Sequence, residues 1–378
     1  MDVIQHFRQL LDDRRRVEAF RSAIRELIST QTRVAEIGSA LGTYSLFAAQ
    51  QNALKIYAIE MADVYYLGKE SARQNGYADK IEFLHGKSTE IELPEKVDFI
   101  IMEEYTPFFF YNGLEEVVTD ARSRFLRPGG KFIPNNIILK IAPVECPKMY
   151  HSLHLWEKQE DRLYDIDWSV TTRIAMNQPH PAQDTKIELL SPEVTIKEID
   201  LARDSNFPFS FSAELEASRS GTLHGLLGWW DCRFTPTQFF SNSPLAASNT
   251  WGQMYFPIRH PVSVRKGEKL KLQLHVSESR YSRQINYKWV IDHHSSFQEY
   301  NTFRAGPPDR ARLDNFVLEH IPLLNPVELR KRNMLNLIDG QTNWRQIASS
   351  LVKKHPDQFP DFDAAMAALA KFARKTDS

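Results

Sequence analysis

The chain has 378 residues, with 47 lysines and arginines against 48 aspartates and glutamates, and 42% of its residues are hydrophobic. A net charge of −1 gives no electrostatic reason to expect nucleic acid or an anionic membrane as a partner. The two cysteines, Cys146 and Cys232, are too few for a disulfide framework or a cysteine metal site. No apolar run reaches the roughly 20 residues of a membrane span, and the first residues lack the apolar core of a signal peptide, so we expect a cytoplasmic protein.

The first 135 residues combine helical and strand-like patterns. Residues 1–30 place apolar side chains at helical spacing, which predicts helices there. From Arg33 on, short apolar runs typical of buried strands alternate with amphipathic segments; the runs are VAEIG, KIYAIE, KIEFLHG and VDFIIM. The alternation ends near a turn in FLRPGGKFIP, and it predicts a doubly wound, Rossmann-like parallel sheet in a first domain, residues 1–135.

The remaining residues predict two further domains. Residues 136–309 consist mainly of strand-like runs joined by turn-rich connections, which favours an antiparallel barrel or sandwich. Within that range, residues 150–185 fit the strand pattern poorly, and we expect an inserted helix or arm. Residues 310–378 return to helical spacing, with Asn325 and Pro326 as a helix start and Gly340 as a helix end.

Gly38 and Gly42 mark the turn after the first predicted strand. A glycine turn between a strand and a helix lets backbone N–H groups approach a ligand. Glu60 ends the next strand, where an acid can accept hydrogen bonds from ribose hydroxyls. Ala40 breaks the G-x-G-x-x-G dinucleotide pattern, and a plain strand-to-helix connection is the alternative. With Glu60 in this position, a ligand that carries a nucleoside is the better interpretation.

The stretch DFIIMEEYTPFFFY, residues 98–111, places Glu103 and Glu104 directly after a buried strand. Carboxylates are costly there unless they have partners, and the carboxyl end of a parallel strand borders the ligand crevice. Adjacent residues in an extended chain point to opposite sides, so both glutamates face one ligand only if the chain turns. The aromatic residues that follow, Phe108 to Tyr111, fit a domain core and the wall of an apolar pocket equally well.

The segment VAEIGSALGTYSLFAA, followed by IYAIEM, resembles the S-adenosylmethionine-binding core of class I methyltransferases. LLDDRRRVEAFRSAI, HGKSTEIELPEKVDFIIMEE, FLRPGGKFIP and SNSPLAASNTWGQ occur in the order found in protein arginine methyltransferases, so the resemblance covers about residues 6–300. It implies S-adenosylmethionine as the cofactor, with Arg16 paired to its methionine carboxylate and Glu60 holding its ribose. The other cofactor-side residues that the resemblance implies are Gly38, Gly42, Met61 and Thr89.

The same resemblance assigns Glu103 to the acceptor, as the first of two glutamates that grip a substrate guanidinium. The second glutamate corresponds to Asn112, and a histidine–tryptophan pair in a distant loop corresponds to Thr250 and Trp251. Glu104 stands where the family has a tryptophan, and we expect the family's tyrosine-bearing N-terminal helix to be absent or shortened. The implied catalytic set is therefore Glu103, Asn112 and Trp251. Because one carboxylate is missing, Asn112 is expected to make the pocket less suited to guanidinium.

Two features lie outside this pattern. Near the C-terminus, DGQTNWRQIASSL resembles the helical part of PqqD-type winged-helix domains, which bind the leader of a precursor peptide; a helical packing appendage is the alternative. His293 and His294 have no acid or cysteine partner at metal-ligand spacing in the sequence, so we expect no metal site.

These patterns predict a methyltransferase that acts on a peptide, protein or amino-acid-like acceptor, at nitrogen by the family resemblance. One alternative is methyl transfer to a carboxylate or another neutral or anionic nucleophile in peptide natural-product biosynthesis. Another is a non-catalytic binding or scaffold protein on a methyltransferase fold. The resemblance also implies a homodimer that forms through the arm at residues 150–185.

Overall fold

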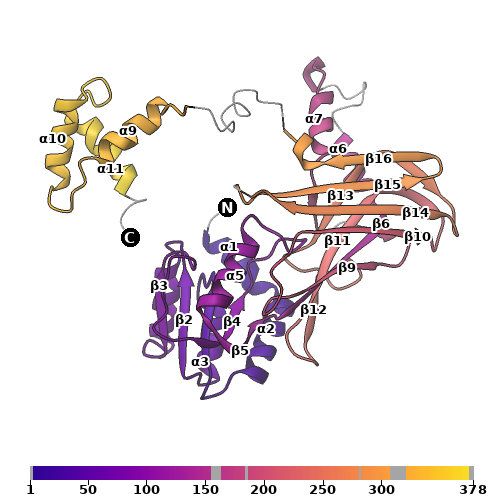
Figure 1. The fold of residues 1–378 in the computed structure, drawn as a ribbon, viewed down its shortest axis with the longest axis horizontal. Helices are drawn as coiled ribbons and strands as arrows, with labels where there is room; N and C mark the ends of the chain where they lie inside the picture. The colour runs from indigo at the N-terminus through magenta and orange to yellow at the C-terminus, as the bar shows by residue number, and fades with distance from the viewer. Residues whose placement is uncertain (1–2, 155–162, 184–185, 281, 307–320, 374–378) are drawn as a thin grey trace. The chain divides into compact units, whose positions relative to one another are not determined.

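The structure is a computed structural model that describes residues 3–154, 163–183, 186–280, 282–306 and 321–373. The chain divides into two compact units, residues 1–307 and residues 308–378. The first unit holds a parallel sheet with its helices and a barrel-like antiparallel part, and the described residues of the second unit are helical (Figure 1). The predicted fold class is confirmed in these three parts, while the predicted domain boundaries stay predictions.

Five parallel strands form the first sheet in the order β3-β2-β1-β4-β5. Their bounds are β1 Arg33–Ile37, β2 Lys55–Glu60, β3 Ile81–His85, β4 Val97–Met102 and β5 Leu126–Ile133. Nearly every residue of β1, β2 and β4 is buried, as expected for a parallel sheet that is covered on both faces. The strand order reverses between β1 and β4. Ligands of open α/β sheets bind at the carboxyl ends of the strands beside such a point.

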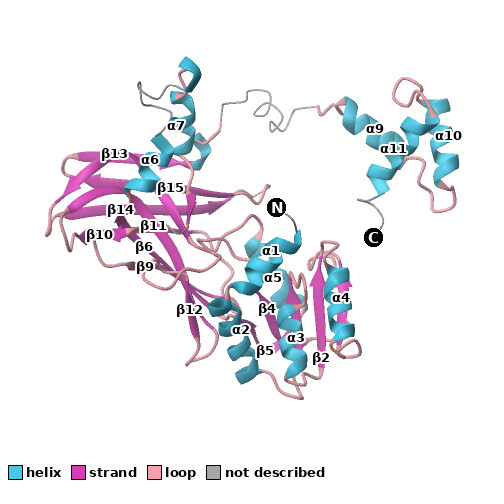
Figure 2. Cartoon of the chain, turned by 180° about the vertical axis from the view of Figure 1, so that it is seen from behind, coloured by secondary structure: helices cyan, strands magenta, loops and turns pink. Residues whose placement is uncertain are grey.

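The helices that accompany this sheet are α1 Val3–Asp12, α2 Arg14–Leu27, α3 Thr43–Gln50, α4 Tyr65–Gln74 and α5 Leu114–Arg124. Helix α2 packs against α3 (Figure 2) and also contacts β5 and the short strand β12, Phe239–Ser241, of the antiparallel part. Its buried stripe contains Phe20 and Ile24 at helical spacing. Asp13 caps the start of α2 by accepting a hydrogen bond from the Arg16 N–H at 3.1 Å. Helix α2 therefore joins the two parts of the first unit.

The antiparallel part contains two sheets, one in the order β10-β14-β15-β16 and the other in the order β7-β13-β11-β6-β8, with β9 beside β6 and β12 beside β11. The remaining bounds are β6 Asn136–Glu145, β7 His180–Ala182, β8 Glu188–Leu189, β9 Val194–Asp200, β10 Phe209–Glu216, β11 Gly221–Arg233, β13 Gln253–Val264, β14 Lys269–Glu278, β15 Ile285–His293 and β16 Ser296–Asn301. One hydrophobic core runs from the parallel sheet into these strands. At the junction, the ring of Phe108 meets that of Phe256 edge-on at 5.4 Å between centroids. This continuous core fixes the two parts against each other.

The predicted arm, residues 150–185, lies partly outside the described residues, because residues 155–162 and 184–185 are not described. Its described elements are the end of helix α6, Pro147–His154, a 3-10 turn, Leu163–Asp165, helix α7, Ser169–Ala175, and strand β7. Tyr164, Ile166 and Val170 are exposed apolar side chains in this segment. The described part is thus largely helical and presents apolar surface.

The second unit packs three helices, α9 Pro326–Leu335, α10 Trp344–Lys354 and α11 Phe362–Ala373, around a small core of its own. The predicted helix start at Asn325 is confirmed, because its side chain accepts the Glu328 N–H at 2.9 Å. Asn343 and Gln346 form a reciprocal capping box on α10. Residues 321–373 contain no strand that corresponds to the wing of a winged-helix domain. Neither these helices nor the others in the described part of the chain are long and apolar enough to cross a membrane.

Candidate active site

The turn after β1 has left-handed backbone conformations at Gly38 (φ +69°), Ala40 (φ +47°) and Gly42 (φ +72°). Glycine adopts such angles without strain. Gly42 is also close-packed, since an added Cβ would lie 2.9 Å from the Phe83 ring. Gly42 is the N-cap residue of α3, and the Glu36 carboxylate accepts the Ser45 N–H in the first turn of that helix. The predicted glycine turn is therefore closely packed between β1 and α3.

Glu60, the last residue of β2, accepts hydrogen bonds from this turn. Its buried carboxylate accepts the Ala40 N–H at 2.9 Å with one oxygen and the Ala62 N–H at 2.7 Å with the other. A carboxylate offers about four acceptor positions, so these bonds leave capacity for a ligand. Met61, the next residue, is 65% exposed, and Thr89, in the loop after β3, is half-buried. Both follow the carboxyl ends of parallel strands, and their place beside a bound nucleoside stays a prediction.

An ion pair between Arg16 and Glu103 lies in the same crevice. The Arg16 side chain, from α2, is 3% exposed and contacts the Glu103 carboxylate, which follows β4. Arg16 also donates to the Leu10 carbonyl, and its Nε lies 3.7 Å from the Asp13 carboxylate. Its guanidinium sits 5.4 Å from the centre of the Trp251 ring. The structure thus brings together three predicted site residues, Arg16, Glu103 and Trp251, from distant parts of the sequence.

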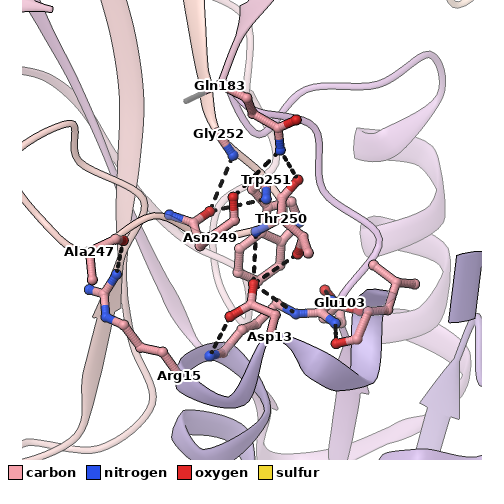
Figure 3. A network of polar contacts seen from close by, with 11 residues as sticks. Asp13, Arg15, Glu103, Gln183, Ala247, Asn249, Thr250, Trp251 and Gly252 are labelled. Atoms are coloured by element: carbon pink, nitrogen blue, oxygen red, sulfur yellow. Dashed lines mark hydrogen bonds and ion pairs between the residues drawn. The ribbon is translucent and has the colours of Figure 1, made fainter. Parts of the chain in front are cut away.

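Asp13 connects α2 to the loop before β13 (Figure 3). Besides capping α2, its carboxylate accepts hydrogen bonds from the Thr250 N–H at 2.8 Å and from the Thr250 hydroxyl at 2.9 Å. In the same loop, the Asn249 side-chain oxygen accepts the Trp251 N–H at 3.0 Å. We did not predict a role for Asp13, although an aspartate directly before a helical stripe is a helix-start signal. Asp13 therefore holds the loop of Trp251 against the first turn of α2.

The chain turns directly after β4, so Glu103 and Glu104 meet different parts of the crevice. The Tyr105 N–H donates to the Glu103 carbonyl at 2.9 Å, which makes a three-residue turn centred on Glu104. Glu103 meets Arg16. Glu104 lies against the glycine turn, since a Cβ added to Gly38 would be 2.5 Å from the Glu104 Cδ. The turn that the sequence left open is therefore present.

Burial shifts the acidity of these carboxyl groups. It raises the pKa of Glu103 from 4.5 to about 7, against the opposing effect of Arg16. It also raises the pKa of Glu36, in β1, to about 8, although the Ser45 N–H and hydroxyl stabilise the charged form. Burial and the charge of Glu60 together raise the pKa of Glu104. Several shifted carboxyl groups in one crevice are typical of a functional site.

A cavity of about 50 Å³ lies between the glycine turn and α1. Its lining residues are Phe7, Leu10, Leu11, Arg16, Val17, Glu36, Gly38, Ser39, Ala40, Leu41, Thr43, Tyr44 and Glu103. Among the described residues, the Ser39 hydroxyl finds no hydrogen-bond partner although Ser39 is 3% exposed. Ligand pockets usually measure about 300–1,000 Å³, so this cavity as it stands is smaller than a nucleoside site. The free hydroxyl, the arginine and the acids nevertheless fit a polar, charged ligand such as S-adenosylmethionine.

A wider cavity of about 600 Å³ borders the contact between Asp13 and Thr250. It is lined by His6, Gln9, Leu10, Asp12, Asp13, Arg14, Arg15, Gln183, Ser248, Asn249 and Thr250. These residues come from α1, the start of α2, the segment after β7 and the loop before β13. The cavity is therefore a polar space of mixed charge beside the loop of Trp251.

Asn112 is the predicted site residue that the structure leaves outside this cluster. It is exposed, and its side-chain oxygen accepts the Ile285 N–H at the start of β15 at 2.9 Å. Between Glu104 and Asn112, the rings of Phe108, Phe109 and Phe110 are buried in the core between the two parts. The segment is anchored by these rings, so Asn112 emerges next to β15. Its contacts do not support the predicted acceptor role, and the aromatic run is core.

His293 and His294 have an acidic neighbour that the sequence did not reveal. The Glu268 carboxylate lies 3.3 Å from His293 Nε2, and the Ser295 hydroxyl lies 2.8 Å from His293 Nδ1. The candidate ligand atoms of Glu268, His293 and His294 all lie within 4.8 Å of one another. Both ring nitrogens of the buried His293 therefore have protein partners, and the expectation of no metal site stays a prediction.

Residues 136–295 match the family model of the arginine methyltransferase oligomerization subdomain. The chain is 31% identical over 245 residues to a probable protein arginine N-methyltransferase 6 of Arabidopsis thaliana. The matched residues make up 60% of this chain and 54% of that protein. It is 26% identical to protein arginine N-methyltransferase 1 of Schizosaccharomyces pombe, over 70% of this chain and 79% of that protein. The chain thus spans about half of one such relative and more than three quarters of another.

Two solved structures share the fold. The Trypanosoma brucei PRMT1 enzyme-prozyme heterotetrameric complex with AdoHcy has a TM-score of 0.70 at 22% identity, covering 78% of this chain and 96% of that chain. Arabidopsis thaliana protein arginine methyltransferase 10 has a TM-score of 0.65 at 22% identity, and the match covers 79% of this chain and 97% of that chain. These likenesses and the sequence matches confirm a class I methyltransferase fold that resembles the protein arginine methyltransferases.

Proposed function

We propose that the chain is an S-adenosylmethionine-dependent methyltransferase that modifies a peptide, protein or amino-acid-like acceptor at nitrogen. The observation that carries the proposal is the Arg16–Glu103 ion pair beside the glycine turn. It sets a cation suited to a cofactor carboxylate next to a carboxylate suited to an acceptor, in one crevice. The relatives named as arginine N-methyltransferases support the reaction, and the AdoHcy in the Trypanosoma brucei complex supports the cofactor.

The cofactor would be held by residues on the glycine-turn side of the crevice. Arg16 would bind its carboxylate, Glu60 its ribose hydroxyls, and the Ser39 hydroxyl a further polar group. Gly38 and Gly42 would line it, with Met61 and Thr89 on the side of the adenine. When bound, S-adenosylmethionine supplies an electrophilic methyl group, so the protein's task is to position and orient the acceptor.

The acceptor side would depend on Glu103, with Trp251 as a wall. A carboxyl group with a pKa of about 7 can hold the acceptor by a hydrogen bond and take up a proton from its nitrogen near neutral pH. Because Asn112 bonds to Ile285, Glu103 has no second clamping residue at that position. An acceptor that needs one hydrogen-bonding carboxylate therefore suits this side better than a doubly clamped guanidinium. The 600 Å³ cavity is the proposed approach.

Two alternatives remain as proposals. The first is transfer to a carboxylate or another neutral or anionic nucleophile in peptide natural-product biosynthesis, which the replacement of the family's second glutamate by Asn112 favours. The second is a non-catalytic binding or scaffold protein, which the replacement of the family histidine by Thr250 favours. Against the scaffold, the Ser39 hydroxyl is buried without a partner in the described structure, as expected of a site that binds a ligand.

We also propose a homodimer formed through the arm at residues 150–185. The match to an oligomerization subdomain and the exposed apolar side chains of Tyr164, Ile166 and Val170 support it. Light scattering across micromolar concentrations tests it, and a monomer mass throughout would contradict it. Binding of a precursor peptide by residues 310–378, and a cytoplasmic location, are further proposals.

Calorimetry with S-adenosylhomocysteine and transfer of a labelled methyl group to a panel of peptides and amino acids test the main proposal. We expect Glu60→Ala to weaken cofactor binding about tenfold or more, because it removes charged hydrogen-bond acceptors. We expect Glu103→Gln to lower turnover strongly with a much smaller change in cofactor affinity. Asp63→Asn, on a side chain that is 92% exposed, is the control. Binding without any transfer would favour the scaffold over the enzyme, and no binding at all would contradict the methyltransferase.

A further inference from the structure

Glu104 differs from Glu60 and Glu103 in having no hydrogen-bond or ion-pair partner in the described part of the chain. Glu103 is paired with Arg16, and Glu60 accepts two backbone N–H groups. In the described part of the chain, no hydrogen bond or ion pair joins Glu104 to another residue, and the Glu104 side chain is exposed. Its carboxylate is therefore open to a ligand that carries a positive charge.

The place of Glu104 is set by the turn after β4. The hydrogen bond from the Tyr105 N–H to the Glu103 carbonyl directs Glu103 toward α2 and Glu104 toward β1. At Gly38, an added Cβ would lie 2.5 Å from Glu104 Cδ and 2.8 Å from Glu104 Oε2. The carboxylate therefore rests directly on the glycine backbone, on the side of the crevice that also contains Glu60.

The charges around Glu104 favour a bound cation. Its carboxylate is close enough to Glu60 for that charge to raise the pKa of Glu104, and Glu104 in turn raises the pKa of Glu103. Arg16 offsets Glu103, which leaves Glu60 and Glu104 as neighbouring like charges on the cofactor side. Like charges at short range destabilise each other, and a bound positive charge removes that cost.

Resting on the proposed function, we infer that Glu104 recognises the positive charge on the sulfur of S-adenosylmethionine and makes the site prefer it to uncharged S-adenosylhomocysteine. A cationic acceptor is the other possible source of charge, but Glu104 lies on Gly38, whereas Glu103 lies with Arg16 and Trp251. Glu104 thus sets the relative affinity of the site for S-adenosylmethionine and S-adenosylhomocysteine. Because the attraction is absent in the demethylated product, it also favours product release.

Calorimetry with both ligands tests this inference on the full-length protein, wild type and Glu104→Gln. Glutamine keeps the size and shape of the side chain and removes its charge. We expect the variant to bind S-adenosylmethionine about tenfold more weakly, while its affinity for S-adenosylhomocysteine changes less than about twofold. Glu90→Gln is the matched control, because Glu90 is an exposed glutamate that pairs with Lys87. It should change neither affinity, and an unchanged unfolding midpoint shows that each variant is folded.

Three results would overturn the inference. An equal loss for both ligands would mean that Glu104 contacts a group common to them, and unchanged affinities would mean that it faces solvent. Either result would leave the proposed cofactor site intact, because the wild type still binds. Failure of the wild type to bind either ligand would overturn the proposed function together with this inference.

Discussion

The two sides of the crevice are built in different ways. The cofactor side is local: the glycine turn, β2 and Glu60 lie within residues 33–60, and short backbone hydrogen bonds join Glu60 to Ala40 and Ala62. The acceptor side is assembled from distant segments: Asp13 bonds to Thr250, and Glu103 and Trp251 lie beside Arg16, the residue that would also bind the cofactor carboxylate. Its geometry therefore depends on the packing of α2 against the antiparallel part.

This difference indicates which residues of the crevice can be exchanged without loss of the ligand geometry. A strand–turn–helix–strand unit keeps its ligand geometry wherever it folds, because its contacts are close in sequence. The acceptor side can lose or exchange one contributing residue while the cofactor side stays intact. The departures from the family pattern at Glu104, Asn112 and Thr250 all lie outside residues 33–60, and the predictions below separate the two sides experimentally.

The largest effect on stability is expected from Arg16→Ala, which removes the cation that pairs with Glu103. It leaves the Glu103 carboxylate without its ion-pair partner, and breaking a buried pair in this way costs about 3–5 kcal/mol. Urea unfolding should show a loss of this order in the free energy of unfolding. Arg14→Ala, at an exposed position in the same turn, is the control. A loss no larger than in the control would mean that the two sides do not depend on this ion pair.

The next effect is a dependence of stability on pH. Burial raises the pKa of Glu103 to about 7 and that of Glu36 to about 8. The folded protein therefore keeps these protons to higher pH than the unfolded chain, whose glutamates ionise near pH 4.5. Stability should fall as pH rises from about 4.5 to 8, with a slope of about 1.4 kcal/mol per pH unit for each extra bound proton. Unfolding measured from pH 5 to 9 checks the sign, and Glu36→Gln should flatten the curve between pH 7 and 8. A curve that rises over that range would refute the assignment.

Asp13→Ala should have an intermediate effect, because it releases the loop of Trp251 from α2. The substitution removes charge-assisted hydrogen bonds to Thr250 and the cap of α2, and one such bond contributes about 1.5–3 kcal/mol. We expect reduced stability and a larger loss in methyl transfer than in cofactor affinity. Asp12→Ala, on a side chain that is 71% exposed, is the control. Equal losses in transfer and in cofactor affinity would show that Asp13 serves both sides alike.

The local side could be predicted from the sequence for a physical reason. Apolar strand runs, the glycines of the turn and the acid at the end of β2 are all set by backbone geometry within one strand–helix–strand unit. The same periodicity gave the antiparallel strands and the C-terminal helices, including the cap at Asn325. The family resemblance added Arg16 and Trp251, which nothing in their own neighbourhood marks as site residues.

The assembled side could be predicted only in part, because its contacts depend on tertiary packing. Asp13 carried a helix-cap signal, but nothing in the sequence linked it to Thr250. The direction of the Glu104 side chain could not be predicted from the sequence, because it depends on the turn that the hydrogen bond from the Tyr105 N–H to the Glu103 carbonyl makes. Asn112 followed the family alignment, yet the buried rings of Phe108 to Phe110 carry the chain away from the crevice before it reaches Asn112. Likewise Glu268 meets His293 only through the antiparallel pairing of β14 with β15.

The smallest effect is expected at Asn112, and it decides whether this residue belongs to the crevice. Asn112→Ala removes the acceptor for the Ile285 N–H, a neutral hydrogen bond at an exposed site that contributes about 0.5–1.5 kcal/mol. Asn112→Asp keeps an acceptor oxygen in the same place and should retain the wild-type stability. Asn112→Glu restores the acid of the family pattern, but it should not shift turnover toward arginine peptides, because the side chain starts beside β15. Unfolding in urea and turnover on an arginine peptide check these expectations. A clear gain on the arginine peptide with Asn112→Glu would mean that this segment swings into the crevice when the acceptor binds, and that the acceptor side is assembled only then.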